Sequence, residues 1–204
     1  ADERGNPAKG IYFKATLKGV DLYITDKGLT YVFTGPMPQL PDRKILTDPG
    51  KLSLALKNTE VEFCRVDMDL EGARINADNI TASDEPAAGA RLNYYLGHCP
   101  KGILNVRTFR KVVVQDVYPG IDWVLKYDAQ GVKYDFVVRP GARPETISLA
   151  YKGAKSITGT ENEQGGQYLL VKTPMGEIRE GDLVCFEQNG DPVDTHYNIA
   201  GNRV

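Results

Sequence analysis

Four aspartates, Asp116, Asp122, Asp128 and Asp135, lie within one strongly patterned stretch of the chain, residues 116–141. Two carboxylates on neighbouring strands could serve as the acid and base of a glycosidase. Several carboxylates together could instead bind calcium. The alternative interpretation is that these side chains cap turns and line the polar faces of strands, and the positions of the aspartates help to decide between these roles.

Two of the aspartates lie beside expected turns. Asp116 comes just before Tyr118-Pro119-Gly120, which suits a type II turn because proline sets φ at the second position and glycine accepts a positive φ at the third. Asp128 lies in the polar break between two alternating runs. Aspartate side chains in such places commonly accept hydrogen bonds from nearby backbone N–H groups. The pattern therefore favours a structural role for both residues.

Asp122 and Asp135 each alternate with apolar residues, which places them on the polar faces of two expected strands. Lys126 and Lys133 occupy the same faces, where their ammonium groups can screen the carboxylates. The D-x-[DN]-x-[DN]-G spacing of a calcium loop does not occur. We therefore expect no catalytic residue, metal or cofactor, and we keep Asp116, Asp122 and Asp135 only as calcium candidates.

Cysteine and histidine are the other reactive residue types, with three and two copies respectively. Cys64 and Cys185 lie within apolar runs and are expected to be small buried hydrophobes, whereas Cys99 lies in an expected turn after His98. A Cys64–Cys99 disulfide and a Cys99–His196 catalytic pair are both left open. No two cysteines have the spacing of a zinc site, and no common hydrolase or nucleotide-binding motif occurs.

Composition and charge argue against a nucleic-acid-binding protein and against a membrane-spanning chain. The chain has 204 residues and a formal net charge of −2, with basic and acidic residues interspersed. No basic block indicates nucleic-acid binding, and no apolar run reaches the roughly 18 residues of a membrane-spanning helix. The first residues lack the apolar region of a signal peptide. The sequence predicts a globular chain without a membrane span.

Apolar and polar residues alternate with a period of two through most of the chain, which predicts strands. Residues 20–33 read as a hairpin around Asp26-Lys27-Gly28, and a proline-rich loop follows. Residues 121–138 read as the best hairpin. Its apolar face consists of Ile121, Trp123, Leu125, Tyr127, Val132, Tyr134, Phe136 and Val138.

Other segments are predicted less directly. A change of phase near Phe63-Cys64 indicates a β-bulge, and further strands are expected at 91–97, 106–117, 147–153, 167–173 and 182–188. Residues 76–90 read as a polar loop and mark a candidate internal division. The segments 68–75 and 149–157 echo one another, which suggests two related β-modules. The predicted fold is an all-β antiparallel β-sandwich with little helix, forming one module over 1–204.

Several motifs together resemble a known family. An Asn-Tyr-Tyr strand precedes a DVYPGID motif, and a YDFVV strand that ends in Pro-Gly follows it. These motifs resemble the uncharacterised N-terminal domain that precedes SBBP-type β-propeller repeats, found in exported Bacteroidota proteins with gliding-motility or type IX secretion sorting domains. The matching residues, expected to be structural, are Asn93, Tyr94, Gly97, Asp116, Tyr118, Pro119, Gly120, Asp122, Tyr134, Asp135, Phe136, Pro140, Gly141, Gly153 and Ala154.

The resemblance implies location and context rather than a reaction, because that family has no established activity. The first hypothesis is therefore a non-catalytic structural or interaction module of a longer exported or cell-surface bacterial protein. Its expected partners are flanking domains of the same polypeptide, and a cell-surface protein or glycan. The alternatives are a carbohydrate-binding module and a hydrolase that uses acids of the 116–135 hairpin.

Overall fold

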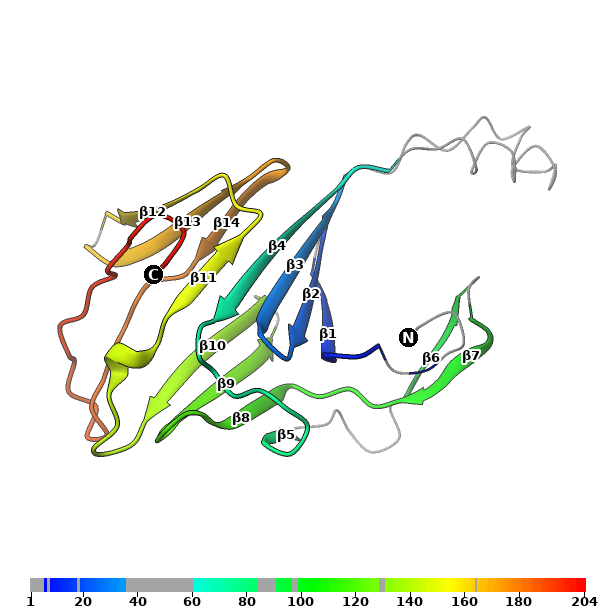
Figure 1. The fold of residues 1–204 in the computed structure, drawn as a ribbon, viewed down its shortest axis with the longest axis horizontal. Coiled ribbons are helices and arrows are strands. Elements are labelled where there is room, and N and C mark those ends of the chain that lie inside the picture. The colour runs from blue at the N-terminus through cyan, green and yellow to red at the C-terminus, as the bar shows by residue number, and fades with distance from the viewer. Residues whose placement is uncertain are drawn as a thin grey trace.

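The computed structural model describes residues 6, 8–17, 19–35, 61–83, 91–96, 99–128, 131–163 and 165–204. These residues form antiparallel strands and one short 3₁₀ turn, η1 (Pro144–Thr146), so the predicted all-β class is confirmed (Figure 1). None of the described residues belongs to a helix long and apolar enough to cross a membrane.

The largest sheet has five strands in the order β1–β2–β3–β4–β11. The strands are β1 (Ile11–Leu17), β2 (Val20–Thr25), β3 (Gly28–Thr34), β4 (Phe63–Leu70) and β11 (Leu149–Lys152). The predicted 20–33 hairpin is confirmed as the β2–β3 pair. Period-2 alternation places most apolar residues of these strands on one face. Phe63 at the start of β4 is an exception, because it is 74 % exposed.

A second sheet has the strand order β10–β9–β8–β5. The strands are β5 (Ile80–Ser83), β8 (Lys111–Tyr118), β9 (Ile121–Asp128) and β10 (Gly131–Val138). The predicted 121–138 hairpin is confirmed, with Trp123 opposite Phe136 and Ile121 opposite Val138. Trp123 is completely buried, whereas Tyr127, at the end of the same apolar face, is 43 % exposed.

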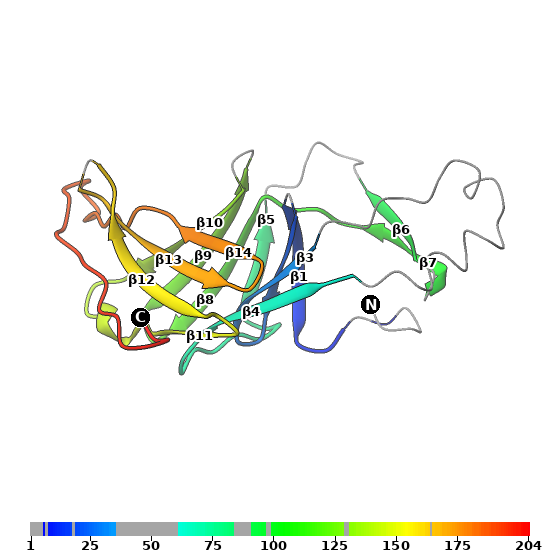
Figure 2. The same cartoon turned by 90° about the horizontal axis from the view of Figure 1, so that it is seen from above.

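Two smaller sheets complete the fold. The three-stranded sheet consists of β12 (Ser156–Glu161), β13 (Gln167–Thr173) and β14 (Gly176–Glu180), and the two-stranded sheet of β6 (Leu92–Leu96) and β7 (Cys99–Val106). Figures 1 and 2 show these two sheets at opposite ends of the molecule. The β6–β7 hairpin carries the exposed aromatic rings of Tyr94 and Tyr95.

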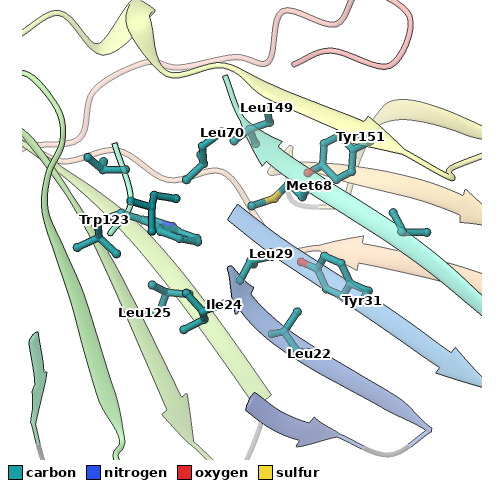
Figure 3. Packing of buried hydrophobic residues seen from close by; sticks show 14 of the residues in the cluster. Leu22, Ile24, Leu29, Tyr31, Met68, Leu70, Trp123, Leu125, Leu149 and Tyr151 are labelled. Carbon is teal, nitrogen blue, oxygen red and sulfur yellow. The ribbon is translucent and has the colours of Figure 1, made fainter. Parts of the chain in front are cut away.

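One hydrophobic core joins the inner faces of the three larger sheets. Trp123 and Leu125 of β9 face Leu29 of β3, and the side chains of β4 and β11 continue the same packing (Figure 3). Trp123 also stacks on Phe136 at 6.4 Å between ring centroids and meets Tyr134 edge-on at 6.3 Å. Aromatic contacts of this kind add to the energy of area burial, so the 121–138 hairpin is fixed against the core.

The two echoing segments are neighbours in space, because β4 pairs directly with β11. Each strand is followed by a glycine in the left-handed region, Gly72 with φ of 72° and Gly153 with φ of 82°. At Gly153 a Cβ atom would lie 2.3 Å from the carbonyl oxygen of Arg65, so only glycine fits there. The similarity therefore reflects two comparable turns at the ends of paired strands.

Two predictions about strands near the ends of the sheets were wrong. Residues 182–188 form no strand beyond a single bridge between Phe186 and Pro192, and Phe186 is exposed. The strand of this region is β14, which the sequence did not predict because a glutamate, Glu180, shares its inner face with Ile178. The predicted loop at 76–90 contains β5, whose Ile80 and Ala82 pack against the core. Four residues are too few to show a convincing period.

Other boundaries also differ from prediction. The strand expected over 106–117 is divided between β7 and β8. The pairing of β3 with β4 runs without a register shift through Cys64 and Phe63, so the bulge expected there does not occur. Register shifts occur instead in the β1–β2, β6–β7 and β8–β9 pairs. In β8 the shift lies between Val114 and Tyr118, and we call it the β8 bulge.

The cysteines are free, so a Cys64–Cys99 disulfide is not formed. Cys64 is buried in β4, as expected, but Cys185 is exposed. Cys99 begins strand β7 and is buried rather than lying in an open turn. His98 lies outside the described residues.

Candidate functional site

The DVYPGID motif forms an ion-pair network on the outer face of the four-stranded sheet. The Arg139 guanidinium donates to both oxygens of Asp122 at 2.9 and 2.8 Å, and its other terminal nitrogen donates to Asp116. All three side chains are at least partly exposed, at 44 % for Arg139, 21 % for Asp122 and 58 % for Asp116. Arg139 thus joins two of the aspartates that the sequence marked as calcium candidates.

The same aspartates hold the backbone of the bulge in β8. Asp116 has a φ of 47°, a left-handed conformation that aspartate tolerates better than most residues. Its N–H donates to Asp122 Oδ1 at 2.8 Å, and the Gly120 N–H donates to Asp116 Oδ1 at 3.2 Å. The backbone hydrogen bond expected for Asp116 is therefore present, and the motif fixes both the bulge and the turn that follows.

Asn79, the residue just before β5, supports the bulge, a role that the sequence did not reveal. Its side chain is buried, and its Nδ2 donates to the carbonyl oxygens of Gln115 at 2.7 Å and Arg74 at 2.9 Å. The Arg74 N–H in turn donates to the Val117 carbonyl oxygen at 2.8 Å. A buried amide that satisfies bulge carbonyls is difficult to recognise in a polar loop sequence, because its partners are remote.

The remaining acid of the hairpin lies apart from this network. Asp135 forms an ion pair with Lys126 at 3.1 Å across β9 and β10, and both side chains are about half exposed. The side chain of Asp128 is outside the described part of the chain. Within the described residues, no three histidine, cysteine or acidic side chains are grouped as a metal site would require.

The other residues of the family motif also have local structural contacts. The Asn93 Oδ1 accepts the Asn105 N–H at 2.8 Å, and the Tyr118 hydroxyl donates to the Ser148 carbonyl oxygen at 3.4 Å. Gly120 has a φ of 75°, and a Cβ at this position would lie 2.8 Å from the Cβ of Ala142. Pro140 is exposed beside the left-handed Gly141, Ala154 packs against the core, and Gly97 is outside the described residues.

A second carboxylate, Glu180 of β14, lies inside the molecule and is only 7 % exposed. It accepts hydrogen bonds from two hydroxyls, those of Tyr134 on β10 and Tyr31 on β3, the latter at 3.4 Å. The Tyr151 hydroxyl of β11 is buried and close enough to interact electrostatically with the carboxylate, although it completes no hydrogen bond of ordinary geometry. We call Glu180, Tyr31, Tyr134 and Tyr151 the buried Glu–Tyr cluster.

The cluster alters the protonation of its members. Burial raises the pKa of Glu180, and the tyrosine hydroxyls that donate to the carboxylate partly offset this effect. Burial and the nearby carboxylate raise the pKa of Tyr31, Tyr134 and Tyr151 far above the usual range. The same causes raise the pKa of Tyr197, in the segment after β14, to about 12.

The buried Glu–Tyr cluster connects all three larger sheets, because its members come from the five-stranded sheet, the four-stranded sheet and β14. The sequence placed Tyr31 and Tyr134 on apolar faces but did not identify Glu180. Its only signal is a glutamate two residues after Ile178 in a short strand. The arrangement suits a structural joint, since phenol hydroxyls can solvate a buried carboxylate and hold it in one geometry.

An open polar depression lies at one end of the three-stranded sheet. Its lining residues are Glu161, Asn162, Glu163, Tyr168, Arg179 and Asp182. The Arg179 guanidinium covers the ring of Tyr168 at 4.0 Å and pairs with Asp182 at 3.3 Å. The only aromatic ring among these lining residues is therefore already stacked on a cation.

The structure does not bring Cys99 and His196 together. Cys99 begins β7, whereas His196 belongs to the segment after β14. These segments lie at opposite ends of the molecule (Figures 1 and 2). A catalytic pair of these two residues, left open by the sequence, is therefore excluded in this fold.

Comparison with known proteins identifies a family. Residues 2–204 match the family described as Domain of unknown function (DUF7948), so the chain belongs to that family. Neither the curated proteins nor the solved structures provide a match.

Proposed function

We propose that this DUF7948 domain is a non-catalytic structural or interaction module of an exported or cell-surface multidomain protein. The observation that carries the proposal is the arrangement of the DVYPGID motif. Asp116 and Asp122 bind backbone N–H groups and Arg139, and these contacts define a bulge and a turn. Carboxylates that hold backbone N–H groups and an arginine in this way support a structural role for the motif.

The cellular context of the proposal comes from the sequence motifs. The DVYPGID and YDFVV segments resemble domains that precede SBBP-type repeats in exported Bacteroidota proteins with type IX secretion or gliding-motility sorting domains. On this basis, the expected partners are flanking domains of the same polypeptide and a cell-surface protein or glycan. A module of this kind contributes a rigid spacer or a contact surface.

Carbohydrate binding is the second candidate function, favoured by the open depression on the three-stranded sheet. Its carboxylates, amide and guanidinium offer many donors and acceptors to sugar hydroxyls. The Arg179 guanidinium occupies one face of the Tyr168 ring, so a sugar could not stack on that face unless the guanidinium moves. This requirement makes the depression a weaker candidate than a groove with two open rings.

A glycan array, followed by aryl-glycoside turnover assays, separates the proposed function from both alternatives. For a structural module we expect no turnover, and Asp122→Asn and Asp135→Asn should change only stability, by about 1 kcal/mol or less. Glycan binding that disappears in Tyr168→Ala would instead establish a carbohydrate-binding module. Turnover that is abolished by Asp122→Asn or Asp135→Asn, with the unfolding curve unchanged, would establish a hydrolase.

A further inference from the structure

The last described residues, Asn202–Val204, pair with the edge of the five-stranded sheet through an isolated bridge. The Leu149 N–H donates to the Val204 carbonyl oxygen at 2.8 Å, and the Val204 N–H donates to the Leu149 carbonyl oxygen at 2.9 Å. The Tyr151 N–H donates to the Asn202 carbonyl oxygen at 2.9 Å, and Ala150 lies opposite Arg203. Asn202–Val204 thus pairs antiparallel with the edge of β11 that β4 leaves free.

Side chains make this edge selective for the strand that fills it. Val204 packs against the hydrophobic core, and the Arg203 guanidinium pairs with Glu71 at 3.0 Å. Glu71 is itself positioned by the Ser148 hydroxyl, which donates to it at 3.2 Å. The edge therefore offers backbone partners, an apolar contact and a carboxylate in a row, the features by which an extended peptide adds to a sheet.

The segment that leads to this pairing is mostly exposed, and near its end Tyr197 and Ile199 pack against the core. Residues 181–199 form no strand, and most of their side chains are exposed. Figure 1 shows this orange and red segment running along the outside of the molecule from β14 to the C marker beside β11. Its contacts with the body include the Leu183 N–H donated to Gln167 O at 2.6 Å and Ile199 against Gly159. We call residues 181–204 the arm.

The arm covers the β11 edge, and its removal would leave the Leu149 and Tyr151 N–H groups without a protein partner. The side chains of both residues are buried, at 6 % and 1 % exposure. A sheet edge with unpaired backbone groups is a ready template for pairing with another chain. The three backbone bonds are the same whether the strand that forms them comes from its own chain or from another.

We propose that the β11 edge is a strand-acceptor site, and that a second copy of this chain fills it by exchanging its arm. Exchange preserves every contact of Asn202–Val204, and the contacts of Leu183, Tyr197 and Ile199 are formed again on the second copy when residues 181–199 cross between the two bodies. The tether keeps its own arm at an effective concentration of about millimolar, so the closed monomer dominates in dilute solution. Exchange is favoured when chains fold together at high concentration, as in domain swapping.

A disulfide that can form only between two chains tests the proposal. One chain carries Ala150→Cys and the other carries Arg203→Cys, both in a Cys185→Ser background because Cys185 is exposed. Ala150 and Arg203 are directly opposite each other, at a separation suited to a disulfide. The two chains are unfolded together, refolded at high concentration and oxidised, and the products are separated on a non-reducing gel.

We expect a cross-linked heterodimer whose ratio to monomer rises about in proportion to the protein concentration during refolding. The matched control pairs Ala150→Cys with Asn189→Cys, because Asn189 is an exposed arm residue that does not face β11. A yield of heterodimer no greater than that of the control would overturn the proposal. Folding of each variant is verified by circular dichroism before mixing.

A second measurement uses the unaltered chain and does not depend on the variants. Refolding at high concentration should yield a dimer by light scattering, and this dimer should return to monomer after unfolding and refolding at low concentration. At about millimolar protein, the concentration of arms from other chains equals the effective concentration of the chain's own tethered arm. A chain that remains monomeric after refolding at this concentration would contradict arm exchange.

Discussion

On the outer face of the four-stranded sheet, the carboxylates of Asp122 and Asp135 pair with Arg139 and Lys126 in contact with solvent. On the inner face of the same sheet, the Tyr134 hydroxyl donates to Glu180, which is buried and forms no ion pair with any described residue. The carboxylates of the first group are at least partly exposed, whereas Glu180 is enclosed and accepts hydrogen bonds from tyrosine hydroxyls. The comparison shows that the face of the sheet on which a carboxylate lies, rather than the residue type, decides how much its contacts contribute to the free energy of unfolding.

The largest expected effect is on the inner face and comes from Trp123→Ala. The indole is completely buried against Phe136 and Tyr134, so truncation should lower the free energy of unfolding by about 3–5 kcal/mol through cavity formation. Its N–H makes no hydrogen bond to the described residues, so Trp123→Phe should cost less. Tyr127→Ala is the matched control, since Tyr127 shares the alternation but is exposed. Denaturant unfolding that shows a loss below about 1 kcal/mol for Trp123→Ala would contradict core packing.

The next effect concerns the hydroxyl that solvates Glu180. Tyr134→Phe removes a hydrogen bond to a buried carboxylate and should destabilise the fold by about 1.5–3 kcal/mol, measured by denaturant unfolding at neutral pH. Tyr95→Phe serves as control because the Tyr95 side chain is 74 % exposed, and it should have almost no effect. Equal effects of the two substitutions would refute the importance of the buried Glu–Tyr cluster.

Glu180 should also make stability depend on pH. Because burial raises its pKa in the folded state, the unfolded chain binds fewer protons above the ordinary glutamate pKa of about 4.3. The contribution of Glu180 is therefore fully present below that value and is lost as pH rises through the folded pKa. Each unit of pKa elevation corresponds to about 1.4 kcal/mol.

Glu180→Gln tests this dependence, since glutamine keeps the shape of the side chain and does not titrate. The free energy of unfolding of the variant, minus that of the unaltered chain, should increase as pH rises from 4 towards 7. The change begins near the ordinary glutamate pKa of about 4.3, where the unfolded chain starts to lose its proton. Thermal unfolding across this range measures the difference. A constant difference at all pH values would show that the pKa of Glu180 is not raised.

The smallest effects are expected on the outer face. Asp116→Ala removes the acceptor of the Gly120 N–H and places alanine at a left-handed φ, so we expect a loss of about 0.5–2 kcal/mol. Asp116→Gly should recover part of this loss because glycine relieves the backbone strain. Asp135→Ala, which breaks only the exposed pair with Lys126, should cost about 1 kcal/mol or less.

Calcium should not raise the melting temperature of the unaltered chain. A rise that disappears in Asp116→Asn would show that the outer carboxylates bind metal.

Local pattern was sufficient to predict the two strongest hairpins and the faces of their strands. Alternation in residues 121–138 determines which side chains share a face, and Pro119-Gly120 determines where the chain turns, because both depend on neighbouring residues. The same reasoning failed at β14 and at residues 182–188. There, burial depends on which segment reaches the core, and the more apolar segment remained outside.

The sequence by itself determined the all-β class and the 121–138 hairpin. The structural role of the hairpin aspartates stays a prediction. Only the tertiary structure decided that Arg139 joins Asp116 to Asp122, that Glu180 is buried, and that Asn202–Val204 completes the β11 edge. The physical reason is the distance along the chain between partners. Tyr31 and Glu180 are 149 positions apart, and no local period relates residues that meet only when separate sheets pack together.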